Sequence, residues 1–208
     1  MMIGKMILML AAGAMVLAAP APDAEAASST KGAGVTVAIP EAETVMSDAE
    51  AADVRPIDVR TIEITRELPV EHWLRPGEYV WDAEAAAQAR GRTIVVVNLR
   101  SRTLSAYKGG IEIGRSSILY GYGDHPTPTG TFPVMQKKRD HISNIYNAPM
   151  PHMLRLTRDG VALHGSARMA DDAATHGCVG LPREFAALLF DHVAVGDRVV
   201  IWSGRAQG

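Results

Sequence analysis

The stretch "RTIVVVNLRSRTLSAYKGGIEIGRSSILY", residues 92–120, decides the fold class. It holds three runs rich in Val, Ile, Leu and Tyr, and the pair Gly109-Gly110 separates the second run from the third. β-Branched and aromatic residues favour strands, and a two-glycine turn between two such runs is typical of a β-hairpin. The sequence therefore predicts a domain built mainly of β-strands.

Further strands are expected on the C-terminal side of this hairpin. One begins at Thr131, after a loop marked by Pro and Gly. The segments 152–157 and 160–165 are two apolar runs joined by a short Asp-Gly turn, which predicts another strand pair. A last strand is expected at 197–202, where the sequence is "DRVVIW".

One helix and one long loop complete this part of the chain. Residues 183–193, "REFAALLFDHV", have the apolar period of an amphipathic helix and follow Pro182, a residue that favours helix starts. The polar segment 137–151 is long for a compact β domain, and such loops often cover sites. The sequence thus predicts that residues 91–203 form a β-rich domain with one firm helix.

Residues 66–90 form an ordered lead-in to this domain. Trp73, Tyr79 and Trp81 lie around a Pro-Gly turn, and Asp82 can cap a short alanine-rich helix. We expect the aromatic side chains to pack on the domain that follows. The alternative that the two tryptophans form a sugar-binding surface stays open at this point.

The N-terminal residues predict export. Residues 1–27 contain Lys5, an apolar run from Met6 to Ala19 and the small-residue pattern Ala24-Glu25-Ala26, which together are typical of a secretory signal peptide. The apolar run is too short for a membrane span, so no span is expected after cleavage. Residues 28–65 lack aromatic residues and apolar periodicity, and they predict a flexible linker.

Composition limits the partners. The chain has 208 residues, a formal net charge of −2 and a pI near 6.4. It therefore offers no basic field of the kind that binds nucleic acid, and nucleic acid is not an expected partner.

The chain holds a single cysteine, Cys178, within "ATHGCVGLP". An exported chain that uses disulfides carries an even number of cysteines, so an odd one is a small buried hydrophobe, half of an intermolecular bridge or a nucleophile. A nucleophilic thiol needs a base, and His164 at the end of an apolar strand is better fixed for this than His176 in the same turn as the thiol. Gly177 lets the backbone turn sharply, so the amides of Gly177 and Cys178 can donate to an oxyanion.

Two other interpretations of this cluster stay open. His164 and His176 can be structural residues beside a buried thiol. A zinc site is the second alternative, with His125, His164, His176 and Cys178 as its ligands.

The order of short motifs along the chain resembles the L,D-transpeptidase catalytic domain, or YkuD domain, of bacterial cell-wall enzymes. The motifs are Thr-Pro-Thr-Gly-x-Phe at 127–132, Met-Pro at 150–151, His-Gly at 164–165 and Thr-His-Gly-Cys at 175–178. The resemblance covers roughly residues 92–202. It implies an L,D-transpeptidase-like β-sandwich with one main C-terminal helix, located in the periplasm and associated with the cell wall.

The resemblance also implies an activity. In such enzymes a cysteine attacks a peptidoglycan stem peptide, expels the terminal D-alanine and passes the acyl group to an amine, with no cofactor or metal. Here it makes Cys178 the nucleophile, His164 the base and the Gly165 carbonyl the group that orients the imidazole, and it places His176 with the Gly177 and Cys178 amides around the oxyanion. Carbapenem-type β-lactams are expected to acylate the thiol.

Substrate contacts are implied by the same comparison. The segment 138–153 corresponds to a lid, so the residues expected to touch the stem peptide are Tyr146, Met150, His152, Thr175 and Arg183. The family usually has Arg or Asn two positions after the cysteine, where this chain has Gly180. Arg183 and Arg168 are the candidates to replace that group. Hydrolysis of the acyl-enzyme, as in a carboxypeptidase, and an inactive wall-binding module are therefore the alternatives to transfer.

Overall fold

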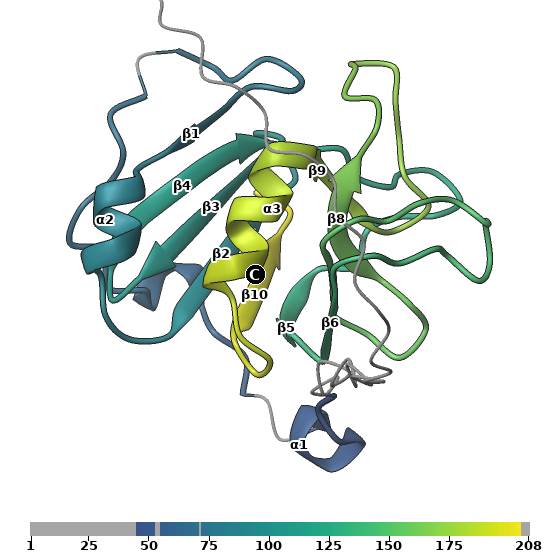
Figure 1. Ribbon diagram of the computed structural model, residues 1–208, viewed down its shortest axis with the longest axis horizontal. Helices are drawn as coiled ribbons and strands as arrows, with labels where there is room; N and C mark the ends of the chain where they lie inside the picture. The colour runs from purple at the N-terminus through teal and green to yellow at the C-terminus, as the bar shows by residue number, and fades with distance from the viewer. Residues whose placement is uncertain (1–44, 53–54, 71, 205–208) are drawn as a thin grey trace, which may run out of the picture. The chain divides into compact units, whose positions relative to one another are not determined.

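The computed structural model describes residues 45–52, 55–70 and 72–204, and these form a domain of two β-sheets (Figure 1). The predicted β-sandwich with one main helix is confirmed. The predicted signal peptide lies outside the described residues. No helix in the described part of the chain is long and apolar enough to span a bilayer.

The first sheet has six strands in the order β1-β4-β3-β2-β10-β5. Their bounds are β1 Tyr79–Trp81, β2 Thr93–Asn98, β3 Thr103–Lys108, β4 Ile111–Ser117, β5 Gly130–Pro133 and β10 Arg198–Trp202. β2, β3 and β4 pair antiparallel, so the predicted hairpin is confirmed. Gly109 and Gly110 in its turn have φ values of 57° and 82°, which residues with a side chain rarely adopt.

The second sheet has four strands in the order β6-β7-β8-β9. Their bounds are β6 Gln136–Lys138, β7 Met153–Arg155, β8 Ala162–Ser166 and β9 Val179–Pro182. β7 and β8 are the predicted antiparallel pair. β6 and β9 were not predicted, because β6 covers only the edge of a polar segment and β9 is one short apolar run without alternation. β9 matters most, because it pairs parallel with β8 and begins directly after Cys178.

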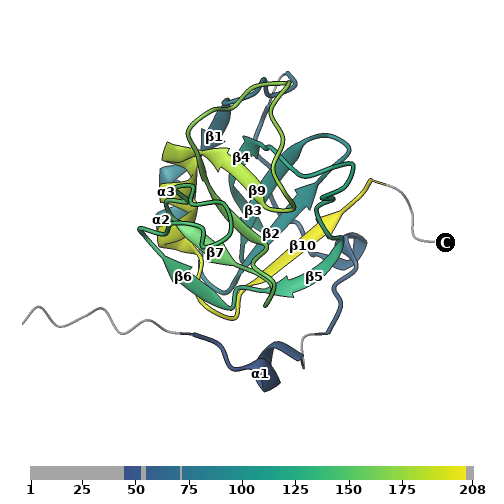
Figure 2. The same cartoon turned by 90° about the vertical axis from the view of Figure 1, so that its right-hand side faces the viewer.

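Helix α3 (Arg183–His192) packs between the sheets and supplies much of the shared core. Phe185 and Leu189 on its apolar face are fully buried among side chains of both sheets, such as Leu104 and Leu163. The short helix α2 (Ala83–Gln88) packs near β4, and Asp82 caps it as expected by accepting a hydrogen bond from the Ala85 amide. Figure 2 shows α2 and α3 on the same side of the first sheet.

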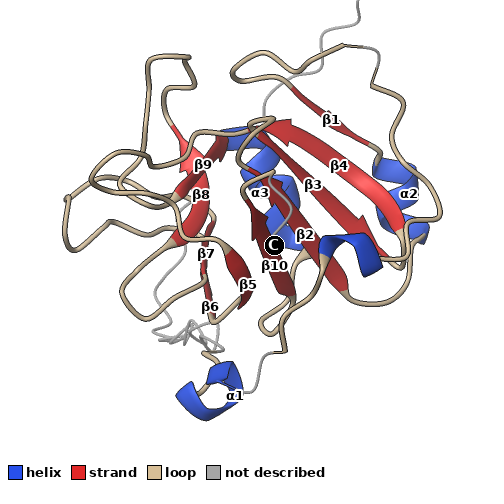
Figure 3. Cartoon of the chain, turned by 180° about the vertical axis from the view of Figure 1, so that it is seen from behind, coloured by secondary structure: helices blue, strands red, loops and turns tan. Residues whose placement is uncertain are grey.

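The other face of the first sheet is crossed by residues 55–70 and 72–74 (Figure 3). This region includes the 3-10 helix η1 (Val59–Thr61), and the separate helix α1 (Asp48–Ala52) precedes it. Within the segment 28–65, which the sequence predicts to be a linker, the Ile57 amide donates to Thr131 Oγ1 at 2.8 Å and the Thr65 amide donates to the Gly110 carbonyl. Residues 28–44, 53 and 54 of that segment lie outside the described residues.

Two of the three aromatic residues in the lead-in segment 66–90 pack on the domain. β1 joins the first sheet, and the rings of Tyr79 and Trp81 contact Phe185 of α3 at centroid distances of 5.7 and 5.8 Å. Trp73, by contrast, is 76% exposed. The expectation that all three rings pack on the domain is therefore wrong for Trp73.

Candidate active site

Cys178 and His164 lie on one face of the parallel pair β8 and β9. The register places His164 opposite Gly180, and Cys178 is two residues before Gly180. Side chains two residues apart in extended backbone point to the same side of a sheet. The thiol and the imidazole therefore face the same cavity from adjacent strands.

The backbone fixes the tautomer of His164. Its Nδ1 lies 3.0 Å from the carbonyl oxygen of Gly165, and a carbonyl can only accept, so Nδ1 carries the proton and Nε2 is left as a base. Burial lowers the pKa of His164 below its ordinary value, against the Gly165 hydrogen bond, which raises it. The imidazole is therefore neutral over the ordinary pH range, which is the form a general base requires.

The thiol of Cys178 is half-buried. Its Sγ lies 3.7 Å from the carbonyl oxygen of Gly160, and Met150 and Met153 belong to the apolar cluster against which it packs. Burial raises the pKa of Cys178 above its ordinary value, and the Asp159 carboxylate adds to this rise. The thiol and the imidazole line the same cavity, and burial favours the neutral form of each.

Two threonines hold the backbone of the nucleophile. Thr175 and Thr127 both donate their hydroxyl hydrogen to the carbonyl oxygen of Cys178. The hydroxyl of Thr127 also accepts from the Gly121 amide at 2.8 Å. Between Thr175 and the thiol, Gly177 has a φ of 98°, so the turn needs a glycine. Thr127 is a residue that sequence reasoning placed in a motif but gave no role.

The thiol and the imidazole face a cavity of about 500 Å³, a size that suits a small-molecule or peptide ligand. Segments from 143–150, 159–168 and 173–178 line it, together with Leu119. The predicted site residues that the structure brings to this cavity are Tyr146, Met150, His164, Thr175, His176 and Cys178. Of the long loop that the sequence predicts to cover the site, the C-terminal part, 143–150, lines the cavity.

The imidazole of His176 lies between two other rings. It stacks on Tyr146 at a centroid distance of 4.7 Å and contacts His125 at 5.0 Å. Tyr146 comes from the long loop and His176 from the turn that carries the thiol. This stack therefore joins the loop to the nucleophile's turn at the mouth of the cavity.

The structure does not bring His152 and Arg183 to the cavity. The ring of His152 packs edge-on against Phe190 of α3 at a centroid distance of 5.6 Å, and the residue has a φ of 55°. Arg183 is the first residue of α3 and is exposed. Arg168 does line the cavity, and its guanidinium is held by Asp172 at 2.8 Å. Of the two arginines considered for the role of the missing polar group, only Arg168 is in place.

Gly180 explains the shape of the cavity floor. Its backbone forms two hydrogen bonds with Leu119, of 2.9 and 3.0 Å. A Cβ atom at this position would lie 3.3 Å from the Leu119 Cβ and 3.4 Å from the Ser166 Cβ, and both of those residues line the cavity. The apolar side chain of Leu119 therefore stands beside the place where the resemblance leads one to expect Arg or Asn.

The zinc alternative finds no ligand set. Within the described ranges, no group of three or more His, Cys, Asp or Glu side chains is placed to hold a metal ion. His164 directs Nδ1 at the Gly165 carbonyl, and His125 packs against the ring of His176.

Comparison with known proteins gives one family. Residues 92–201 match the model of the L,D-transpeptidase catalytic domain, YkuD. L,D-transpeptidase 1 of Mycobacterium tuberculosis (strain ATCC 25618 / H37Rv) is 23% identical over 157 residues, which are 66% of this chain and 62% of that protein. The probable L,D-transpeptidase 3 of the same strain is 26% identical over 97 residues, 39% of this chain and 36% of that protein. The chain thus spans less than two thirds of the length of these relatives.

Solved structures show the same fold. The L,D-transpeptidase LdtMt1 in complex with imipenem matches with a TM-score of 0.51 and 25% identity, over 53% of this chain and 58% of that one. The L,D-transpeptidase (Yku) from Stackebrandtia nassauensis matches with a TM-score of 0.52 and 23% identity, over 58% and 60%.

Proposed function

Since the chain belongs to the family of L,D-transpeptidase catalytic domains (YkuD), we propose that it is a cysteine acyl transferase acting on peptidoglycan stem peptides. The observation that carries this proposal is that Cys178, directly before β9, and His164 of β8 line one cavity, with the Gly165 carbonyl oxygen 3.0 Å from Nδ1 of the imidazole. The nucleophile, the base and the group that orients the base are the elements of thiol acyl transfer.

In the first half-reaction, Sγ of Cys178 attacks the carbonyl carbon of the donor peptide bond while its proton passes to Nε2 of His164. The amides of Gly177 and Cys178, with His176 at the rim, stabilise the negative oxygen of the tetrahedral intermediate. The C–N bond then breaks, the amine of D-alanine takes the proton from His164, and a thioester to Cys178 is left.

In the second half-reaction, an amine of a neighbouring stem attacks the thioester. His164 accepts the amine's proton and returns it to sulfur, so the thiol is regenerated and a new amide joins two stems. The rate of this step depends on excluding water, and the apolar side chains of Leu119, Ile145 and Met150 on the cavity wall serve this purpose.

Arg168 lines the cavity, and both of its hydrogen bonds to Asp172, of 2.8 and 2.9 Å, come from Nη2. A carboxylate of the stem would meet the Nε and Nη1 donors, which these two bonds do not use, unlike Arg115, which gives both Nε and Nη2 to Glu112. In this proposal Arg168 orients the donor stem, and Tyr146 covers the bound peptide together with His176. The location of this activity is the periplasm, on the strength of the signal-like residues 1–27.

One observation favours a second candidate, hydrolysis of the same acyl-enzyme. Gly180 supplies no polar side chain beside the thiol, so a group that would fix the acceptor stem is missing from the floor. If water replaces the amine, the products are a shortened stem and free enzyme, as in an L,D-carboxypeptidase. A wall-binding module without activity is the third candidate, and an unreactive thiol would indicate it.

The test is incubation of the purified protein with tetrapeptide muropeptides, followed by mass analysis of the products. Transfer yields crosslinked dimers, or stems with an exchanged terminal residue when a free amino acid is added. Hydrolysis yields only tripeptide stems. In parallel, a carbapenem such as imipenem is expected to add its mass to wild type and not to Cys178→Ala. Absence of both products and adduct would contradict acyl transfer.

A further inference from the structure

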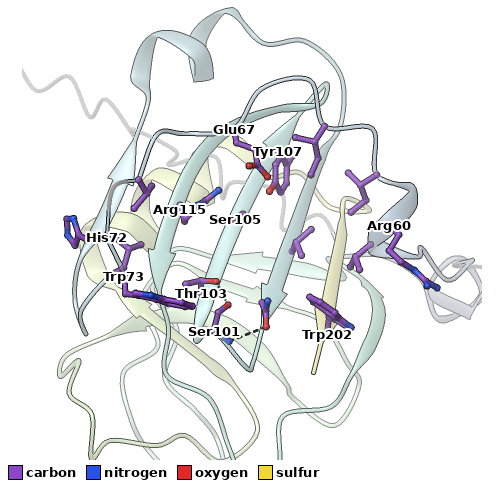
Figure 4. Close-up of a pocket in the computed structure, with 17 residues that line it drawn as sticks. Arg60, Glu67, His72, Trp73, Ser101, Thr103, Ser105, Tyr107, Arg115 and Trp202 are labelled. Atoms are coloured by element: carbon purple, nitrogen blue, oxygen red, sulfur yellow. Dashed lines mark hydrogen bonds between the residues drawn. The ribbon is translucent and has the colours of Figure 1, made fainter. Parts of the chain in front are cut away.

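A second hollow lies on the outer face of the first sheet, away from the thiol. It has a volume of about 600 Å³, and none of its lining residues also lines the catalytic cavity. Strands β2, β3, β4 and β10 form its floor, and residues from 59–70 and 72–74 form its walls (Figure 4). The size falls within the roughly 300–1,000 Å³ typical of ligand sites.

The strand register sets polar side chains in rows on this floor. Trp202, Asn98 and Thr103 are direct neighbours across β10, β2 and β3, and the next row carries Ser105 beside Arg115. The opposite faces of these strands hold core residues such as Val97 and Leu104, so the polar rows follow from the alternation along each strand. The floor therefore carries hydroxyl and amide groups beside Val96 and Tyr107. Asn98 Oδ1 accepts from the Arg100 and Ser101 amides, which leaves the NH₂ of Asn98 as the group that faces a ligand.

Aromatic rings stand on two sides of this patch. Figure 4 shows Trp73 and Trp202 with Ser101 and Thr103 between them. Trp73 is 76% exposed, which is an unusual position for the largest apolar side chain unless a ligand covers it. Tryptophan at a wet site offers a flat apolar surface together with an N–H donor.

The cations of this groove are already paired within the protein. The guanidinium of Arg115 lies 2.7 Å from the Glu112 carboxylate, and that of Arg60 lies 2.7 Å from the Asp58 carboxylate. Glu112 is fully buried and also accepts from the Leu68 amide, so this pair holds the wall onto the floor. A groove whose arginines are committed in this way suits a neutral ligand better than an anionic one.

The floor also argues against a peptide that binds by adding a strand. β2, β3 and β10 each have strand neighbours on both sides, so their backbone donors and acceptors are used within the sheet. A ligand on this face is recognised by side chains alone. Flat rings with an apolar face and a rim of hydroxyl and amide groups match the tryptophans and the polar rows.

We propose that the groove bounded by Trp73 and Trp202 binds a neutral oligosaccharide, namely the β-linked N-acetylated glycan strand of peptidoglycan. The choice of this glycan rests on the proposed function, because the stem peptides are attached to it. Sugar rings stack on Trp73, and Asn98, Thr103 and Ser105 exchange hydrogen bonds with their hydroxyl and acetamido groups. The groove holds the strand while the cavity acts on a stem.

The test uses the full chain and a soluble probe, the β-1,4-linked hexamer of N-acetylglucosamine. Titration calorimetry and tryptophan fluorescence are expected to show saturable binding to wild type and to Cys178→Ala alike. Trp73→Ala is expected to weaken binding roughly tenfold or more, as truncation of a central tryptophan does. Thr103→Val, which removes one floor hydroxyl, is expected to weaken binding to a smaller extent.

Tyr122→Ala is the matched control, because Tyr122 is also an exposed aromatic residue, 61% exposed, but lies outside the groove. It is expected to bind the hexamer as wild type does. The inference is overturned if wild type does not bind the hexamer, if Trp73→Ala binds it equally well, or if a free stem peptide binds there instead. Imipenem labelling of Cys178 separates the glycan-binding claim from the proposed acyl transfer. If Trp73→Ala is fully labelled but does not bind the hexamer, acyl transfer still stands. The same holds if wild type is labelled but does not bind the hexamer.

Discussion

The catalytic cavity and the sheet-face groove are hollows of similar size, about 500 and 600 Å³, but they are built in opposite ways. The cavity lies among loops at the ends of short strands, and burial shifts the pKa of both His164 and Cys178 toward their neutral forms. The groove lies on long regular strands, and its arginines are in ion pairs. Ion pairs hold the arginines of both hollows, so what distinguishes the cavity is the pair of buried groups with shifted pKa values, which is typical of reactive sites.

Replacement of Cys178, the proposed nucleophile, should have the largest effect, because it removes the chemistry of the cavity and leaves the groove unchanged. Cys178→Ala removes the only thiol, so turnover of muropeptides is expected to fall by about 10⁴-fold or more, as for other removed nucleophiles. The melting temperature is expected to change little, because the side chain is half-buried and small. Product mass spectrometry and thermal denaturation measure the two effects. Turnover that survives the substitution would make the thiol structural.

Removal of the base should have the next largest effect. His164→Ala takes away Nε2 and is expected to lower turnover by roughly 10²- to 10⁴-fold, the usual range for a general base. The difference from wild type is expected to shrink at high pH, where the thiolate forms without a base. The rate of Cys178 alkylation by iodoacetamide measures this directly. A rate at neutral pH equal to that of wild type would break the assignment of His164.

The contrast between the hollows also explains what sequence reasoning reached. The runs of β-branched and aromatic residues and the Gly109-Gly110 turn are local signals, and they predicted the hairpin under the groove. β9 has no local signal, and its parallel pairing with β8 is a contact between distant segments. The sequence predicted that His164 serves Cys178 from its place at the end of an apolar strand, and the motif order agreed, but neither signal predicted the strand pairing that brings the two segments together.

Other site features depend on tertiary contacts that no short pattern encodes. His152 and Tyr146 lie in or beside the same predicted loop, yet only Tyr146 reaches the cavity, because the ring of His152 packs on Phe190. Leu119 enters the cavity through its backbone pairing with Gly180. Thr127 contacts Cys178 across the fold, so its role was visible only once the hydroxyl's partners were known.

Replacement of Thr127, which holds the backbone beside the cavity, should have a smaller effect on turnover. Thr127→Val leaves the Gly121 amide and the Cys178 carbonyl each without one partner, and it is expected to lower the free energy of unfolding by about 1–3 kcal/mol. Turnover is expected to fall roughly tenfold, because the carbonyl of the nucleophile is less firmly held. Thr127→Ser, which keeps the hydroxyl, is the control. Equal activity of the two variants would show that the hydrogen bonds do not position the thiol.

The smallest predicted effect is a displacement of the pH profile. Burial lowers the pKa of His164, so its neutral form persists below the pH at which an ordinary histidine is protonated. The acid limb of kcat/KM is therefore expected below the ordinary histidine value of 6.5. Burial raises the pKa of Cys178, so the midpoint of thiolate-dependent alkylation in His164→Ala is expected above the ordinary thiol value of 9.0.

The same shift has a defined sign for stability. Below the pKa that His164 has in the unfolded chain, the unfolded state binds more protons than the folded state, so stability is full above that value and falls as the pH drops toward the lower folded value. His164→Gln, which is uncharged at every pH, is expected to flatten this part of the stability curve. Denaturant unfolding of both proteins between mildly acidic and neutral pH measures the difference. If stability depends on pH in the same way for wild type and His164→Gln, then His164 is protonated as readily in the folded protein as in the unfolded chain. The cavity would then lack the burial-shifted pKa that distinguishes it from the groove.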